Sequence, residues 1–145
     1  MSELPELRVL FVAGFGPIVQ DHRVSLALYK EVLGLPLEAM PQDPTYYHAE
    51  RLDGVKHFAL WPLANAARSC FGTETWPADI PRPSAWLEFE VADVAAAANT
   101  VKARGYRLLV DTKEEPWGQT VARLLSPEGI LIGLTRTPWL HSASS

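Results

Sequence analysis

Histidine and carboxylate side chains are the best candidates for chemistry in this chain of 145 residues. His48 is the best candidate for a general base, because histidine is the side chain whose ordinary titration range lies near neutral pH. Glu88 could also move a proton or attract a cation, and Arg123 could form an ion pair with it across strands instead of contacting a ligand. A lone histidine is more often a structural residue, so both a catalytic and a structural role remain open for His48.

No other catalytic signature accompanies these residues. Cys70 is the single cysteine and lies beside Phe71 without a nearby base, so we interpret it as structural. The chain has no glycine-rich phosphate loop and no Ser-His-Asp signature. His22 and His57 are expected to be surface or packing residues.

Composition places the chain among soluble globular proteins. Hydrophobic residues make up 48% and charged residues 21%, and the length suits one domain, 1–145. No apolar run approaches the roughly 20 residues that a membrane span needs, and the N-terminus is too acidic for a signal peptide. One cysteine fits a reducing cytoplasm. The net charge of −4 and the lack of a Lys/Arg cluster argue against nucleic acid as a partner.

The same order of elements occurs twice along the chain. A strand-like segment, 7–19, precedes a helix predicted over 21–34, in which Val24, Leu28 and Val32 recur at helical spacing. Its predicted caps are Asp21 and Gly34. Asp93 and Gly105 follow them at nearly the same sequence offset and are the predicted caps of a second helix. Three strand candidates follow each helix. We therefore predict an α+β fold of two βαβββ modules, residues 7–62 and 84–138, with a connector over 63–83.

Three segments resemble the vicinal oxygen chelate superfamily, which includes glyoxalase I, bleomycin resistance proteins and extradiol dioxygenases. They are "LALYKEVLGLPLE", "LEFEVADVAAAANTVKARGY" and "PWGQTVARLLSPEGILIGL". They are similar to the family patterns "FYxxVLGL", "FxVxDVxAA" and "PWGxxxxxxDPxGxxIEL". The resemblance implies that the two modules form a cup-shaped pair of half-barrels. It identifies the fold and leaves the function open, because the superfamily hosts several chemistries.

The resemblance also implies where a metal would bind. In the family's metal enzymes, the ligands come from the first and fourth strands of each module. The corresponding positions here are Gly14, Phe58, Trp86 and Gly133. None of these side chains can bind a metal, and a shift by one or two residues adds only His57 or Glu88. We therefore expect no metal and no other cofactor; Gly133 would leave room in the cup or relieve crowding in the sheet.

Strand alternation predicts which side chains face the cup. On 84–91, Leu87, Phe89 and Val91 should pack on a helix, so that Trp86, Glu88 and Glu90 face inward. The resemblance then places Gln119, Val121 and Arg123 inward, together with Tyr46, His48, Phe58 and Leu60. Trp117 lies in a loop that could be a lid or a hydrophobic anchor. The predicted ligand-binding residues are Tyr46, His48, Phe58, Trp86, Glu88, Trp117, Gln119 and Arg123, although the aromatic ones could equally be core.

The leading functional hypothesis is a metal-free protein that binds an aromatic or cationic, antibiotic-like small molecule, as the resemblance to the bleomycin resistance branch implies. We therefore favour the interpretation that the protein is not an enzyme. The alternative is a lyase, isomerase or dioxygenase that is either metal-dependent or uses His48 or Glu88 for proton transfer. The resemblance further implies a homodimer with the cups at or near the interface.

Overall fold

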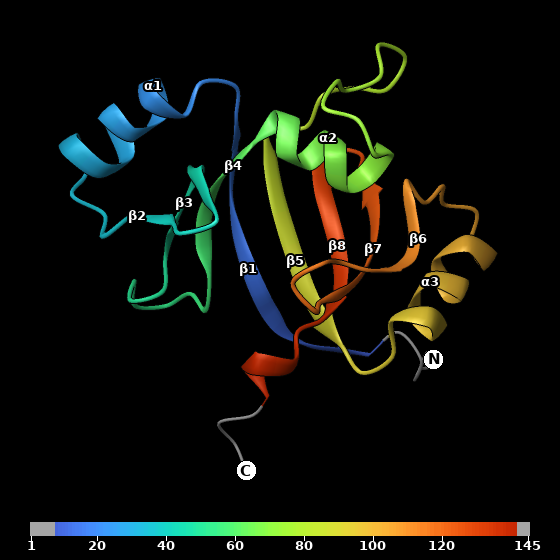
Figure 1. The fold of residues 1–145 in the computed structure, drawn as a ribbon. Helices are drawn as coiled ribbons and strands as arrows, with labels where there is room; N and C mark the ends of the chain where they lie inside the picture. The colour runs from blue at the N-terminus through green and yellow to red at the C-terminus, as the bar shows by residue number, and fades with distance from the viewer. Residues whose placement is uncertain (1–7, 142–145) are drawn as a thin grey trace.

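Eight strands form one mixed sheet in the computed structural model, which describes residues 8–141 (Figure 1). The strand order is β2-β3-β4-β1-β5-β8-β7-β6. The first module supplies β1 (Val9–Val19), β2 (Glu38–Met40), β3 (Asp43–Ala49) and β4 (Phe58–Pro62), and the second supplies β5 (Ala85–Val91), β6 (Val110–Glu114), β7 (Thr120–Leu125) and β8 (Ile130–Arg136).

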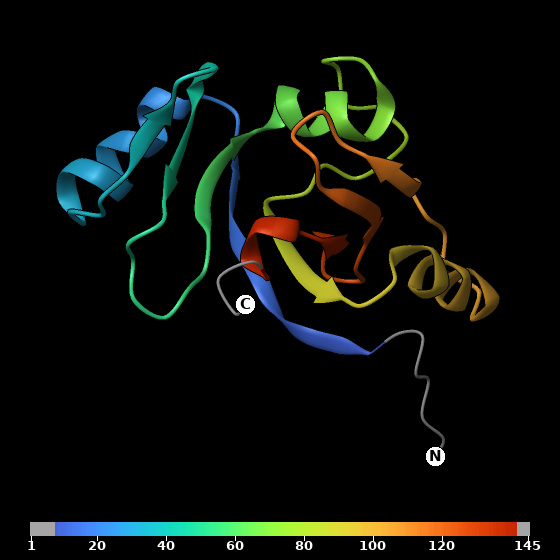
Figure 2. The ribbon, with the colours of Figure 1, turned by 60° about the horizontal axis from the view of Figure 1, so that its bottom comes forward.

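The two modules join where β1 pairs with β5 in antiparallel orientation. In each module the first strand pairs in parallel with the last, β1 with β4 and β5 with β8. The sheet curves so that its two ends approach the same side, which makes a cup (Figure 2). The prediction of an α+β fold built from two βαβββ modules is confirmed.

Helices follow the first strand of each module, occupy the connector and, in one short turn, follow the last strand. They are α1 (His22–Leu26), which continues as the π-helix η2 (Ala27–Val32), α2 (Leu63–Phe71), α3 (Val94–Ala103) and the 3₁₀-helix η3 (Pro138–Leu140). The carboxylate of Asp21 accepts a hydrogen bond from the Arg23 N–H at 3.0 Å, and that of Asp93 accepts one from the Ala96 N–H at 3.0 Å. Both aspartates are therefore N-caps. Across residues 8–141, no helix has the length and apolar character needed to cross a membrane.

The first helix does not bury the apolar residues whose spacing predicted it. Val24, Leu28 and Val32 are 69%, 49% and 74% exposed, whereas Leu26 and Tyr29 contact the core beneath the helix. The segment after Leu26 is π-helical, and in it the Leu33 N–H donates to the Leu28 carbonyl at 2.9 Å. Such i→i+5 bonds add a residue to the turn and interrupt the 3.6-residue period.

Phe58 and Leu60 lie on the outer face of the sheet, not in the cup. They pack with Val19, Leu37 and Ala49 in the core beneath the first helix. The register pairs His48 with Ala59, so that His57, Ala59 and Trp61 are the cup-facing residues of this segment. Phe58 and Leu60 were predicted to face the cup, and this prediction was wrong. It assumed that β4 has the same alternation as β8, which starts directly after the turn residue Gly129. In the first module, residues 55–57 lie between the turn residue Gly54 and β4, and they shift the alternation.

The outer face of the second module is covered by α3, as alternation predicted. Phe89 and Val91 pack there against Ala98, Ala122 and Leu134. The opposite face of β5 is left to Trp86, Glu88 and Glu90, which face the cup.

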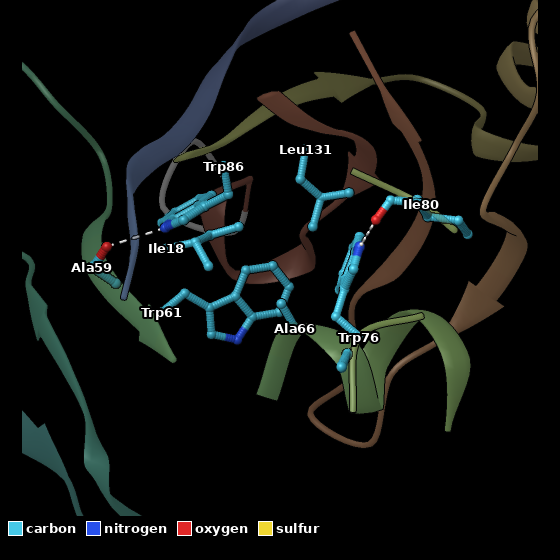
Figure 3. Packing of buried hydrophobic residues seen from close by; sticks show 9 residues of the cluster. Ile18, Ala59, Trp61, Ala66, Trp76, Ile80, Trp86 and Leu131 are labelled. Atoms are coloured by element: carbon cyan, nitrogen blue, oxygen red, sulfur yellow. Dashed lines mark hydrogen bonds between the residues drawn. The ribbon is translucent and has the colours of Figure 1, made fainter. Parts of the chain in front are cut away.

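Helix α2 covers one end of the cup (Figure 1). This helix lies in the segment that was predicted to be a connector. Its N-cap is Pro62, which makes no side-chain cap hydrogen bond, so the sequence lacks the usual signal for the start of a helix. Ala66 and Ala67 are fully buried against a cluster that includes Trp61 and Trp76 (Figure 3). Their small side chains allow the helix to approach the sheet closely, and the helix closes this end of the cup.

Candidate functional site

The end of the cup beneath α2 is filled by tryptophan. Trp86 is 3% exposed, and its Nε1 donates to the Ala59 carbonyl at 3.1 Å (Figure 3). Its ring meets that of Trp61 edge to face, with centroids 6.2 Å apart. A Cβ on Gly16 would come within 2.0 Å of the Ala59 oxygen and 3.0 Å of Trp86 Nε1, so this arrangement requires glycine there. Trp86 is therefore a core residue, and its ring faces are covered by protein.

The middle of the cup holds a buried ion-pair network. Arg123 is 1% exposed, and its Nη1 donates to Oε2 of Glu88 at 3.1 Å. Its Nη2 lies 3.5 Å from Oε2 of Glu115, which also accepts a hydrogen bond from the Ser69 hydroxyl. The guanidinium carbon lies 4.9 Å from the ring centroid of Trp61, a cation–π contact. Glu88 and Arg123 thus form the ion pair across strands that the sequence offered as an alternative to ligand contacts.

A hydrogen-bonded chain runs from this network to an exposed aromatic ring. Gln119, which is 6% exposed, donates from Nε2 to Oε1 of Glu88 at 3.1 Å. Its Oε1 accepts from Nε1 of Trp117 at 2.9 Å. Trp117 is 52% exposed. The loop that carries Trp117, predicted to be a lid or a hydrophobic anchor, therefore presents an indole to solvent and is tied to Glu88 through the side chain of Gln119.

A second polar cluster lies on the cup face of β3 and β4. The Tyr46 hydroxyl and His57 Nε2 share a hydrogen bond of 2.8 Å. The rings of Tyr46 and His48 are stacked with centroids 6.2 Å apart, and those of His48 and His57 are 5.7 Å apart. Burial lowers the pKa of His57, against the opposing effect of Glu88, and burial raises the pKa of Tyr46. Both shifts favour the neutral forms, so the hydroxyl and the imidazole share a neutral hydrogen bond.

His57, expected from the sequence to be a surface or packing residue, faces the cup beside His48. Continuing the Ala49–Phe58 register by one pair sets Glu50 opposite His57, and His48 lies two residues before Glu50 on the same face. Each of these three residues offers one ligand atom, and the three atoms lie within 4.8 Å of one another. A sequence pattern could have indicated this set: two potential ligands at alternate positions, His48 and Glu50, precede a hairpin turn, and a third, His57, follows it.

The opposite end of the cup is closed by the chain after β8. Glu90, which is fully buried, accepts hydrogen bonds from the Thr137 N–H at 2.6 Å and from the Thr135 hydroxyl at 3.0 Å. Nε2 of His141 lies 2.6 Å from the same carboxylate. These contacts hold η3 against β5, which gives Glu90 a structural role.

Residues 15–134 match the Glyoxalase/Bleomycin resistance protein/Dioxygenase superfamily. The chain belongs to this superfamily. Among solved structures, it is similar to a superfamily member from Vibrio splendidus, with 19% identity over 90% of this chain and 99% of that chain and a TM-score of 0.55.

A second similar structure is Streptomyces coelicolor methylmalonyl-CoA epimerase in complex with 2-nitronate-propionyl-CoA, with 17% identity, coverage of 90% and 99%, and a TM-score of 0.52. At these identities the likeness concerns the fold. Comparison with curated proteins finds no match.

The metal centre of the superfamily's metal enzymes does not fit the side chains of this member. The family resemblance assigns three of the four ligand positions to Gly14, Trp86 and Gly133, whose side chains offer no metal-binding atom. The fourth position falls at Phe58 on the outer face, and the cup-facing residues beside it are His57 and Ala59. At most one of the four positions can thus supply a ligand.

Proposed function

We propose that this protein binds a small molecule that carries an aromatic ring and a cationic group, and that it does so without the superfamily's four-position metal centre. One observation carries the proposal: the half-exposed indole of Trp117 is held through Gln119 to the carboxylate of Glu88. An aromatic face and a nearby carboxylate together suit an amine or another organic cation.

The charges on the cup face favour a cation over an anion. Burial has the largest effect on these rings, since it lowers the pKa of His57 and raises that of Tyr46. Glu88 and Glu50 act to raise the pKa of both, because their negative potential disfavours an anion and favours a cation. The positive charge of Arg123 is divided between Glu88 and Glu115. An anionic ligand would meet these carboxylates, whereas a cation would gain from them.

Trp117, and not Trp86, is the proposed stacking residue for the aromatic ring of the ligand. Trp86 is enclosed by the core beneath α2, whereas more than half of the Trp117 surface is accessible. Glu88 retains 13% side-chain exposure even though Arg123 and Gln119 contact it. The proposed site therefore lies on the Gln119 side of Glu88, and it excludes the tryptophan-filled end of the cup.

Matched small molecules test this proposal. Isothermal titration calorimetry would compare indolylalkyl and phenylalkyl amines with the alcohols and carboxylates of the same skeleton, in buffer containing EDTA. We expect the amines to bind more tightly, with an affinity that falls as salt is added. Glu88→Gln and Trp117→Ala should each weaken binding by roughly tenfold. Tyr106→Ala, which removes an equally exposed ring before β6, should leave the affinity unchanged.

Equal affinity for the amine and the alcohol in the wild type and in Glu88→Gln would overturn the assignment of Glu88. Urea unfolding of each variant separates loss of binding from loss of fold. Mass spectrometry of the titrated ligand also tests the alternative, a lyase, isomerase or dioxygenase, because only an enzyme would convert the ligand.

A homodimer is part of the proposal. Val12 and Phe15 of β1 are each 44% exposed, and the exposed Val24 and Leu28 of the first helical segment add further apolar surface. Association through such surface would remove it from water. Light scattering over the micromolar range should give the mass of two chains, and a constant mass of one chain would contradict this.

A further inference from the structure

We infer that His48, Glu50 and His57 form a binding site for a divalent transition metal of the zinc class on the cup face of β3 and β4. This site is distinct from the superfamily's metal centre, because two of its three ligands come from β3 and the turn after it. The inference is independent of the proposed organic ligand.

The backbone already brings the three side chains together. His48 and Glu50 alternate on one side of the hairpin, and His57 lies opposite Glu50 in the continued register. Their ligand atoms all lie within 4.8 Å of one another. In a tetrahedral zinc site with bonds of roughly 2.0–2.1 Å, ligand atoms stand about 3.4 Å apart. Glu50 is a long side chain with 65% exposure, so rotation of its side chain can bring its carboxylate closer to the two imidazoles.

The donor atoms suit such a metal. Two imidazoles and one carboxylate are a ligand set that zinc and its neighbours in the first transition row accept, whereas magnesium and calcium prefer oxygen alone. Nδ1 of His48 is buried and has no hydrogen-bond partner among residues 8–141, and it lies 3.6 Å from Oε2 of Glu50. A buried nitrogen without a partner is costly, and a metal bond would satisfy it.

The surroundings orient the His57 ring. The Tyr46 hydroxyl bonds Nε2 of His57, and such a contact to a second ring nitrogen is typical of metal-binding histidines. Glu50 opens to solvent, so water or a ligand could complete the coordination. Tyr46 would thus hold the His57 ring in place without binding the metal itself.

Cobalt and zinc are suitable probes. The full chain would be treated with EDTA, dialysed and titrated with Co²⁺ while its visible absorption is recorded, and Zn²⁺ binding would be measured by calorimetry. We expect one equivalent per chain and a visible band typical of coordination by nitrogen and oxygen. Glu50→Gln and His48→Gln should each lower the affinity for zinc by at least about tenfold.

His22→Gln is the matched control, because His22 lies at the start of α1 and outside the trio. It should leave the stoichiometry and affinity unchanged. Glu50→Gln alters an exposed side chain, so its circular dichroism and unfolding midpoint should match those of the wild type. Absence of saturable binding, or binding that survives both Glu50→Gln and His48→Gln, would overturn the inference. Amine binding in EDTA does not depend on this result, so the two proposals can fail separately.

Discussion

Arg123 on β7 and Glu88 on β5 form an ion pair that crosses β8 directly over Gly133. Nη1 of Arg123 lies 3.1 Å from Oε2 of Glu88, and Gly133 pairs with Arg123 on one side and with Glu88 on the other. A Cβ on Gly133 would come within 2.9 Å of Glu88 Cγ and 3.1 Å of Arg123 Nη1. The glycine thus creates the space that the ion pair occupies.

The three cup-facing glycines should differ in their tolerance of alanine. Gly133→Ala meets side-chain atoms that can shift, so we expect a loss of about 1–3 kcal/mol in unfolding free energy. Gly14→Ala meets a backbone oxygen at 2.7 Å and Gly16→Ala one at 2.0 Å, and backbone cannot yield as easily. Urea unfolding should therefore rank the losses as Gly16 above Gly14 above Gly133. Equal losses at the three positions would contradict this account of the cup.

Removal of Arg123 should strongly destabilise the fold. Arg123→Ala leaves the carboxylates of Glu88 and Glu115 without their shared partner, and breaking such a buried network costs about 3–5 kcal/mol. Lys102→Ala is the matched control, because the ion pair of Lys102 with Asp111 is half exposed. Its unfolding midpoint in urea should stay close to that of the wild type. A comparable loss in the two variants would show that the Arg123 network is not specially stabilising.

The second module was predicted more accurately from sequence than the first, for a reason visible in the two hairpins. Gly129 ends a tight turn from which β8 starts at once, so alternation placed Gln119 and Arg123 on the same face as Glu88. In the first module, three irregular residues after Gly54 shift the alternation, which moved Phe58 out of the cup and His57 into it. A strand's period is readable from sequence, but its phase depends on the turn before it.

The burial of Trp86 could not be predicted, because an inward-facing aromatic side chain can line a cavity or fill it. The choice is made by α2, whose Ala66 and Ala67 let the helix close over the tryptophans. Likewise, Glu115 reaches Arg123 through contacts between segments far apart in the sequence. Such partners follow from the assembled fold and have no local sequence signal.

Cys70 should react slowly with thiol reagents in the folded protein. Burial raises the pKa of its thiol from 9.0 to about 11, so near pH 8 the reactive thiolate should be about 100-fold less abundant than in the unfolded chain. Ellman's reagent would measure the rate at pH 8 in buffer and in guanidinium chloride. We expect guanidinium chloride to raise the reaction rate of Cys70 at pH 8. We also expect the reaction rate of the folded protein to rise as the pH approaches 11. Fast reaction of the folded protein at pH 8 would indicate an activated cysteine and contradict the structural interpretation.

Tyr46 should make the fold sensitive to alkaline pH. Burial raises the pKa of Tyr46 above its ordinary value of 10.0, so the unfolded chain loses this proton at lower pH than the folded protein. The resulting stability is fully present below pH 10 and is lost as the pH rises above it, by at most about 1.4 kcal/mol per pH unit. Tyr46→Phe should cost about 0.5–1.5 kcal/mol at pH 7, because the hydrogen bond to His57 is lost, and should then show a shallower decline above pH 10. Urea midpoints measured from pH 9 to 11 would give both slopes, with Tyr106→Phe, an exposed tyrosine, as the control that keeps the wild-type slope. Identical slopes for Tyr46→Phe and the wild type would mean that Tyr46 ionises as readily in the folded protein as in the unfolded chain.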